Sequence, residues 1–456
     1  MSGYDIVISG GRVIDPESGL DSIKNLAISD GKIVEISDKT LIAEETIEAT
    51  GQVVAPGFID LHCHPQDTDI FGVQAKDGVT TTLELEVGTN DIPGFYKKWE
   101  GHSPINFGAS IGHIPVRMKV MNDPGVFLPS GDAGRKAASV QEIAEMELLL
   151  RKGLEDGALA VGFGLDYTRG ASRHEVLKMF NIAAEYEASC HVHLRGKGHL
   201  EPLNAIEALE EVIAASAITG APLHVVHINS TGMKAVPILL DMIAGSRKRG
   251  LDISTECYPY TAGMTKIESA LFDDGWQEHY GIDYEQLMRP DTGEYLTQKT
   301  FAEYRESGGW IITFSTPEES MNAAVTHPLT MIATDSIIED GKGHPRTAGS
   351  YTKILGEFVR NKKNLSLVNA LSKMSLMPAQ RLEKRAPAFS KKGRLQVGCD
   401  ADIAVFNPNT VIDNSTYTDP TAAPTGMNYV LVNGTPVVSK GELEEASFPG
   451  KGVLAQ

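Results

Sequence analysis

The stretch PGFIDLHCHPQD, residues 56–67, ends a short apolar run with two histidines one residue apart. Side chains of a β-strand alternate between its two faces. His62 and His64 therefore share one face, whereas Leu61 points to the other. Two imidazoles on one face can chelate a single metal ion. They do so only if other strand ends supply further ligands; otherwise they are ordinary core or surface histidines.

Downstream of this stretch, short apolar strands alternate with helical segments such as VQEIAEMELLLRKGLEDG. We count eight strand candidates: GFIDLHCH, VTTTLELE, FGASIGH, ALAVGFG, SCHVHLR, LHVVHINS, DISTECYPY and TMIATDS. This alternation predicts an α/β fold, a (β/α)₈ TIM barrel, whose active site lies at the carboxyl ends of the strands. A doubly wound open sheet is the alternative, but no glycine-rich phosphate loop opens a helix.

Both ends of the chain are rich in short strands and tight turns. Residues 4–55 contain Gly-Gly and Asp-Gly turns, and the same pattern returns in MNYVLVNGTPVVSKGEL near the C-terminus. We expect residues 1–55 and 390–456 to form one small β-sandwich domain and residues 56–389 to form the barrel. Residues 261–328, which are rich in aromatic and charged side chains, are expected to be a lid over the site.

The composition narrows the possible partners. The 456 residues suffice for a large barrel and a satellite domain, and 41% of them are hydrophobic. A net charge of −19 argues against nucleic acid or an anionic membrane as the main partner. The sequence has no basic and apolar leader and no run of about 18 apolar residues, so the expected compartment is the cytoplasm. Four widely spaced cysteines argue against a disulfide framework. A homo-oligomer stays open.

Further ligand candidates lie at the ends of later strands. His193 ends the fifth candidate strand, His227 the sixth and Asp335 the eighth. By alternation, His191 shares a face with His193 but lies deeper, and His224 lies on the opposite face from His227. Four histidines and an aspartate at strand ends can hold two metal ions, provided that one more anion bridges the ions.

This combination resembles the amidohydrolase superfamily, with PGFIDLHCH on the first strand, single histidines on strands five and six, and aspartate on strand eight. Within it, the chain resembles the D-aminoacylase (N-acyl-D-amino-acid deacylase) group in ECYPYTAGMT, in GHPRTAGSYTKILGEFVR, and in ALSKMSLMPAQRL followed by GRLQVGCDADIAVFNP. The resemblance implies a metal-dependent hydrolase that cleaves the amide bond of an N-acyl-D-amino acid. It also implies zinc, as one or two divalent ions per chain, held by His62, His64, His193, His227 and Asp335.

One departure from the family concerns the bridging ligand. Many superfamily members carry a carboxylated lysine on strand four, and the D-aminoacylase group resembles a pattern with cysteine at the end of strand two. The corresponding stretches here, ALAVGFGLDYTRG and VTTTLELEVGT, have neither residue. Glu84 and Glu86 share one face of strand two, and Glu86 lies nearer the mouth, so we expect Glu86 to bridge. An exposed strand face is the alternative, but unpaired charges are not left inside a barrel.

A second departure concerns the substrate. Two residues after His227, where the group commonly has lysine, stands Asn229, which removes a candidate anchor for a substrate carboxylate. The remaining substrate-binding candidates near the mouth are Arg195, Lys266, Arg346, Tyr167, Tyr258 and, after strand three, His113. Each of them could instead be a structural salt-bridge or packing residue. The basic candidates suggest a small-molecule substrate with an acidic side chain.

The expected catalytic residue is Asp335. A divalent ion activates water and polarises a carbonyl, and Asp335 would take a proton from that water and return it to the departing amine. The alternatives are a cyclic-amide hydrolase of the dihydroorotase or hydantoinase type, a dipeptidase for β-aspartyl peptides, and a non-catalytic barrel. A non-catalytic relative would be expected to lose ligands that this chain keeps. The acyl group, the stereochemistry and the metal stay undetermined by sequence.

Overall fold

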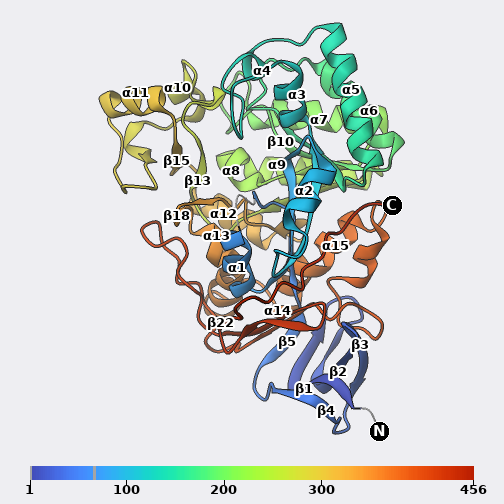
Figure 1. Cartoon of the computed structure of the whole chain (residues 1–456). Helices are drawn as coiled ribbons and strands as arrows, with labels where there is room; N and C mark the ends of the chain where they lie inside the picture. Colours follow the sequence, from blue (N-terminus) through green and yellow to red (C-terminus); the bar gives the residue numbers. More distant parts are fainter. Residues whose placement is uncertain (1–2, 65–67) are drawn as a thin grey trace.

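The computed structural model describes residues 3–64 and 68–456, so the last three residues of the stretch 56–67 lie outside the described residues. Figure 1 shows strands surrounded by helices, with a separate sheet domain below them and a small insertion, drawn in yellow, beside the upper part. None of the helices in the described ranges is long and apolar enough to cross a membrane.

Eight parallel strands form the barrel, hydrogen-bonded in the order β16-β12-β11-β10-β9-β8-β7-β6. They are β6 (Phe58–Asp60), β7 (Val79–Thr89), β8 (Asn106–Gly112), β9 (Ala160–Gly164), β10 (Ser189–His193), β11 (Leu223–Val225), β12 (Ile253–Cys257) and β16 (Thr330–Ile332). A parallel bridge between Cys63 and Ser336 joins the segments that follow β6 and β16, so the sheet nearly closes on itself. The predicted TIM barrel is confirmed.

Helices lie between successive strands and cover the outside of the barrel. The main ones are α1 (Thr68–Lys76), α2 (Ile92–Trp99), α3 (His113–Val120), α5 (Val140–Glu155), α6 (Arg173–Glu185), α7 (Ala205–Thr219), α9 (Val236–Lys248), α12 (Glu318–Thr326) and α13 (Arg346–Lys353). Their ends follow the sequence: Ser139 and Glu142 form a capping box on α5, and Gly220 ends α7 at φ +78°.

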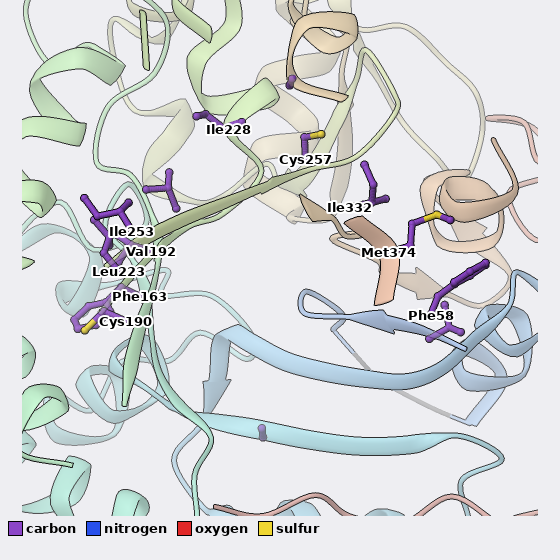
Figure 2. Packing of buried hydrophobic residues seen from close by; sticks show 14 of the residues in the cluster. Phe58, Phe163, Cys190, Val192, Leu223, Ile228, Ile253, Cys257, Ile332 and Met374 are labelled. Carbon is purple, nitrogen blue, oxygen red and sulfur yellow. The ribbon is translucent and has the colours of Figure 1, made fainter. Parts of the chain in front are cut away.

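Alternation along the strands separates an apolar outer layer from a polar interior. On β10, Cys190 and Val192 point outward into the cluster of buried apolar residues in Figure 2, with Leu223 of β11. His191 and His193 point into the barrel, where their rings contact other histidines. Burial of the outer layer against the helices holds the barrel together, which leaves the interior free to carry polar side chains.

The separate sheet domain is built from both ends of the chain, as predicted. Its strands are β1 (Tyr4–Asp15), β2 (Leu20–Ser29), β3 (Lys32–Ser37), β4 (Ala43–Glu48), β5 (Val53–Pro56), β19 (Ile403–Phe406), β20 (Met427–Val432), β21 (Thr435–Ser439) and β22 (Glu442–Leu443). The strand β5 pairs with β1 on one side and with β19 on the other, and so joins the two ends. After β22 the chain returns to the barrel, where Gly452 bridges to Phe107.

An insertion follows β12. It contains β13 (Gly263–Lys266), α10 (Trp276–Tyr280), β14 (Leu287–Met288), α11 (Gln298–Ser307) and β15 (Trp310–Thr313), with the three strands antiparallel in the order β13-β15-β14. Its apolar residues include Trp276 and Phe301, whose rings stack at 5.3 Å, and they form one buried cluster with Val87 of β7, Ile114 of α3 and Leu128 of the loop after α3. The insertion therefore packs against the mouth of the barrel, in the region where a lid was predicted.

Candidate metal centre

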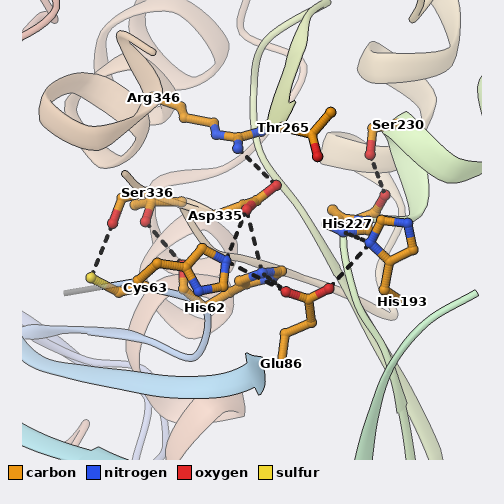
Figure 3. A network of polar contacts seen from close by, with 12 residues as sticks. His62, Cys63, Glu86, His193, His227, Ser230, Thr265, Asp335, Ser336 and Arg346 are labelled. Atoms are coloured by element: carbon orange, nitrogen blue, oxygen red, sulfur yellow. Dashed lines mark hydrogen bonds and ion pairs between the residues drawn. The ribbon is translucent and has the colours of Figure 1, made fainter. Parts of the chain in front are cut away.

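The first group of ligand atoms lies where β6 and β16 end (Figure 3). Asp335 Oδ1 lies 3.4 Å from His62 Nε2 and 3.3 Å from His64 Nε2. Glu86 Oε2, from β7, lies 3.4 and 3.5 Å from the same two nitrogens. Atoms that ligate one tetrahedral ion at about 2.1 Å are themselves about 3.4 Å apart. Three of these side chains, His62, His64 and Asp335, have ligand atoms within 4.8 Å of one another, close enough to hold one metal ion, and Glu86 lies beside them.

A second group shares Glu86 with the first. Glu86 Oε1 lies 3.2 Å from His193 Nδ1, and that nitrogen lies 3.1 Å from His227 Nε2. One carboxylate oxygen thus faces each group, which is the arrangement of a bridging ligand. The structure brings together all six side chains that the sequence nominates as ligands: His62, His64, Glu86, His193, His227 and Asp335.

Unsatisfied polar atoms at the centre fit a metal ion. His62 Nε2 and Glu86 Oε1 are buried and, among the described residues, have no hydrogen-bond partner. Buried polar atoms in folded proteins are nearly always hydrogen-bonded, unless an ion or water takes the partner's place. Imidazole nitrogens and carboxylate oxygens are the donors that zinc and similar divalent ions accept. The donor set therefore fits one or two such ions.

Carboxylates behind the histidines orient their rings. His62 Nδ1 lies 2.6 Å from Glu256 Oε1, and the other oxygen of Glu256 lies 3.0 Å from His224 Nε2. His64 Nδ1 lies 2.8 Å from Glu84 Oε2. A carboxylate that holds Nδ1 turns Nε2 of the same ring toward the ion and raises its basicity. Glu84 thus supports His64, whereas Glu86 faces both ligand groups.

The interior position of His227 corrects one expectation. Strict alternation placed His224 and His227 on opposite faces, but both point into the barrel: His224 contacts Glu256, and the ring of His227 lies 5.2 Å from that of His62. The reason is that β11 ends at Val225 and His227 adopts left-handed backbone angles, with φ +31°. Side chains in that conformation are uncommon and are often found at functional sites.

The charges at the centre suit cation binding. Burial would raise the pKa of Glu86, but the facing His193 and His62 hold it well below its ordinary value. Burial and the adjacent His193 lower the pKa of His227 to about 3, so its imidazole is neutral near pH 7. Burial would also raise the pKa of Asp335, but Arg346 holds it well below its usual range. Burial would lower the pKa of His62 and His64, but the facing carboxylates raise both, to about 9 for His64. The carboxylates and His227 are therefore in the states that bind metal, whereas an ion has to displace protons from His62 and His64.

Of the predicted substrate-binding residues, Arg346 lies next to the metal ligands. Its Nη2 lies 2.9 Å from Asp335 Oδ2, and its guanidinium lies over the ring of Tyr258, 4.5 Å from the centroid. Arg346 Nε and Nη1 are buried and have no hydrogen-bond partner in the described parts of the chain. The hydroxyl of Tyr258 is also buried and has no hydrogen-bond partner among the described residues. These donors are available to an anion beside the metal centre.

The other four candidates have different surroundings. The ring of Tyr167 lies 4.7 Å from that of His193, at the edge of the centre. Lys266 lies farther out, with Nζ 4.0 Å from the ring centroid of Trp310. The side chains of Arg195 and His113 are engaged by carboxylates: Arg195 donates twice to Glu211, at 3.0 and 2.9 Å, and His113 Nε2 lies 2.7 Å from Glu175 Oε1.

An apolar roof covers the centre. The cavity above the ligands is only about 20 Å³, room for one water molecule, and its apolar lining is Val87, Phe127, Leu128, Met264, Trp310 and Ile337. The ring of Phe127 lies 5.2 Å from that of His64 and 5.9 Å from that of Trp310. Trp310 Nε1 donates to Glu339 Oε2 at 2.5 Å. The roof thus joins the loop after α3 to β15 of the insertion.

Sequence reasoning missed Phe127, Trp310 and Glu256. Glu256 could have been predicted to pair with an interior side chain, because a glutamate inside a barrel strand is not left without a partner. The two aromatic residues could not have been predicted, since they come from segments far apart in the sequence that meet only in the fold.

Comparisons with known proteins agree with this geometry. Residues 215–438 match the model of the Amidohydrolase family. The N-acyl-D-glutamate deacylase of Alcaligenes xylosoxydans xylosoxydans is 29% identical over 95% of this chain and 93% of its own length. The D-aminoacylase of the same organism is 25% identical, over 98% and 96%. The crystal structure of N-acyl-D-glutamate deacylase from Bordetella bronchiseptica, complexed with zinc and a phosphonate inhibitor, has a TM-score of 0.83 and 26% identity, with both chains covered completely.

Proposed function

We propose that this member of the amidohydrolase superfamily is a metal-dependent hydrolase that cleaves the amide bond of an N-acyl-D-amino acid to a carboxylate and the free amino acid. One observation carries the proposal: two ligand groups share Glu86, and the unpartnered donors of Arg346 lie directly beside them. The deacylases similar to this chain over nearly its whole length support the amide bond and the D configuration.

The ion that we propose is zinc, in one or two copies, because the donor set fits it and a similar solved protein contains it. His62, His64 and Asp335 would hold one ion, His193 and His227 the other, and Glu86 would contact both. When bound, such ions supply a water that ionises near neutral pH and a polarised substrate carbonyl.

Asp335 would move the proton that amide hydrolysis requires. Its pKa is low, so the carboxylate is ionised and can accept a proton from the attacking water. The amine is a poor leaving group as an anion, so Asp335 would then deliver that proton to the nitrogen as the C–N bond breaks. The ion pair with Arg346 would keep the carboxylate oriented between these two steps.

Arg346 would bind the α-carboxylate of the substrate. A guanidinium with free N–H groups pairs with a carboxylate through two parallel hydrogen bonds. Asn229, which replaces a common lysine, donates instead to the backbone oxygen of Tyr258 at 3.1 Å, and so supports the segment on which Arg346 stacks. Of the three cationic candidates, only Arg346 combines free donors with a position beside the ligands, because Arg195 is paired with Glu211 and Lys266 lies farther out, over the ring of Trp310.

A substrate screen tests the proposal. Zinc-loaded protein is incubated with N-acetyl and N-formyl derivatives of D- and L-amino acids, with dihydroorotate and hydantoin as cyclic amides, and the released amino acid is measured. We expect release from D derivatives and at least a tenfold lower rate with their L enantiomers. Hydrolysis of only the cyclic amides, or of L derivatives in preference, would contradict the proposal. The cytoplasmic location stays a prediction.

A further inference from the structure

A column of hydrogen-bonded side chains runs through the barrel interior behind the metal ligand His62. Glu256 and Ser254 share the inner face of β12, and His224 lies beside them on β11. Glu256 Oε1 lies 2.6 Å from His62 Nδ1, and its Oε2 lies 3.0 Å from His224 Nε2. The other ring nitrogen of His224, Nδ1, lies 2.7 Å from the hydroxyl of Ser254. All four side chains are buried.

Beyond Ser254 the column reaches the end of β12 that lies away from the ligands. Arg381, on α15 (Met377–Leu382), has its Nη1 3.5 Å from Ser254 Oγ. The same guanidinium donates to both carboxylate oxygens of Asp252, at 2.6 and 2.9 Å. Asp252 directly precedes β12, and its side chain is 58% exposed. The column therefore connects the metal centre with the solvent-exposed amino end of β12.

The partners determine which atoms of the column carry hydrogens. A carboxylate only accepts hydrogen bonds, and a neutral imidazole has one N–H donor and one bare nitrogen. Burial lowers the pKa of His224, so its ring is neutral near pH 7. Its Nε2 therefore donates to Glu256, and its Nδ1 accepts from Ser254. Because His62 donates from Nδ1 to the other oxygen of Glu256, Nε2 is the nitrogen of His62 that is left to bind an ion.

A second serine–histidine pair in the same barrel lacks this connection. His191 Nε2 lies 3.0 Å from Ser189 Oγ, and His191 Nδ1 is buried without a hydrogen-bond partner in the described parts of the chain. The rings of His191 and His224 lie 4.6 Å apart, so the two pairs have similar surroundings. They differ in that His224 bonds Glu256, whereas His191 does not.

We propose that His224 and Ser254 are positioning residues which, through Glu256, hold the ring of His62 in the tautomer and orientation that bind the metal ion. His224 fixes one oxygen of Glu256, so the carboxylate cannot rotate and its second oxygen stays on His62 Nδ1. A hydrogen bond to the outer nitrogen of a ligating histidine fixes its ring and raises its basicity. The affinity for this ion is thus set in part by side chains that touch neither ion nor substrate. The inference rests on the metal ligation of the proposed function and goes beyond it.

The experiment measures the zinc affinity of chelated protein by competition with a chromophoric chelator, for wild type and for His224→Phe, Ser254→Ala and His224→Gln. Changes behind a ligand weaken metal binding about 10- to 100-fold, and we expect that loss for one zinc ion in His224→Phe, which fills the space but cannot bond Glu256. Ser254→Ala removes one neutral hydrogen bond and should weaken the same ion about 2- to 10-fold. His224→Gln, whose amide N–H can still donate to Glu256, should recover most of the affinity.

Matched control variants separate positioning from packing. His191→Phe and Ser189→Ala make the same changes in the pair that does not bond Glu256, and both should keep the zinc affinity of wild type. Zinc affinity that is the same in His224→Phe as in His191→Phe would overturn the inference. Should His224→Phe not fold, equal zinc affinities of Ser254→Ala and Ser189→Ala would overturn it instead.

The same measurements keep this inference apart from the proposed function. If wild type binds zinc and the variants differ as expected, but no N-acyl-D-amino acid is hydrolysed, the proposed function is wrong and the positioning role stands. A wild type that binds no zinc would overturn both.

Discussion

Asp335 has two neighbours that define its role: the imidazoles of the first ligand group on Oδ1 and Arg346 on Oδ2. The Asp335→Asn variant keeps its size and leaves the four histidines and Glu86 in place. We therefore expect metal content near that of wild type, and turnover reduced about 10²- to 10⁴-fold because the proton carrier is lost. Elemental analysis and rate measurement on the same sample test this.

Two results would contradict the role of Asp335. If Asp335→Asn loses metal and activity together, the residue acts mainly as a ligand. If a metal-replete Asp335→Asn protein still works within about tenfold of the wild-type rate, the proton is carried by another group. Tyr167, whose ring contacts His193, would be the next residue to test.

The sequence nominated the six side chains that the structure brings together, but it gave the wrong direction for the side chain of His227. Alternation on β10 and β7 correctly orders the deeper His191 and Glu84 behind His193 and Glu86. Alternation predicts the direction of a side chain only within a strand. His227 and Asp335 both lie beyond their strands with positive φ angles, and a left-handed residue turns the chain in a way that a two-residue period cannot anticipate.

At the scale of elements, the account concerns the roof over the metal centre. A cavity of about 20 Å³ is too small for an amino-acid derivative, so we expect the loop that carries Phe127 and the insertion that carries Trp310 to separate before substrate enters. The loop is compact, because the carboxylate of Asp123 accepts hydrogen bonds from four backbone N–H groups within it. We therefore expect it to move as a unit.

Adjacent residues of this loop provide a matched pair of variants. Phe127 packs on His64 and Trp310, whereas Val126 is fully exposed. Phe127→Ala should lower kcat on the order of tenfold, because the closed site then admits water and positions substrate less well. It should also increase hydrogen exchange of residues 263–313. Val126→Ala should change neither kcat nor hydrogen exchange. Indistinguishable kinetics for the two variants would show that the roof does not contribute to turnover.

At the scale of the whole molecule, the alternation of strands and helices specifies the barrel because each strand needs an apolar outer face against a helix. The sequence also predicts that the two ends of the chain form one sheet domain, since β5 and β19 have the short alternating pattern of paired strands. The roof could not be predicted from the sequence in the same way. Its walls come from segments that lie far apart in the sequence and meet only in the folded barrel, and no local period links Phe127 to Trp310.

The central claim is that metal ions held around Glu86 carry out the hydrolysis, and a zinc titration tests it most directly. Chelated protein is titrated with zinc while bound metal and release of the D-amino acid are followed together. We expect no activity without metal and full activity by two equivalents. Glu86→Gln should need at least tenfold more zinc than wild type for half-maximal activity. Glu84→Gln should need a clearly smaller increase. Metal-free wild type that hydrolyses substrate at the full rate would contradict the claim.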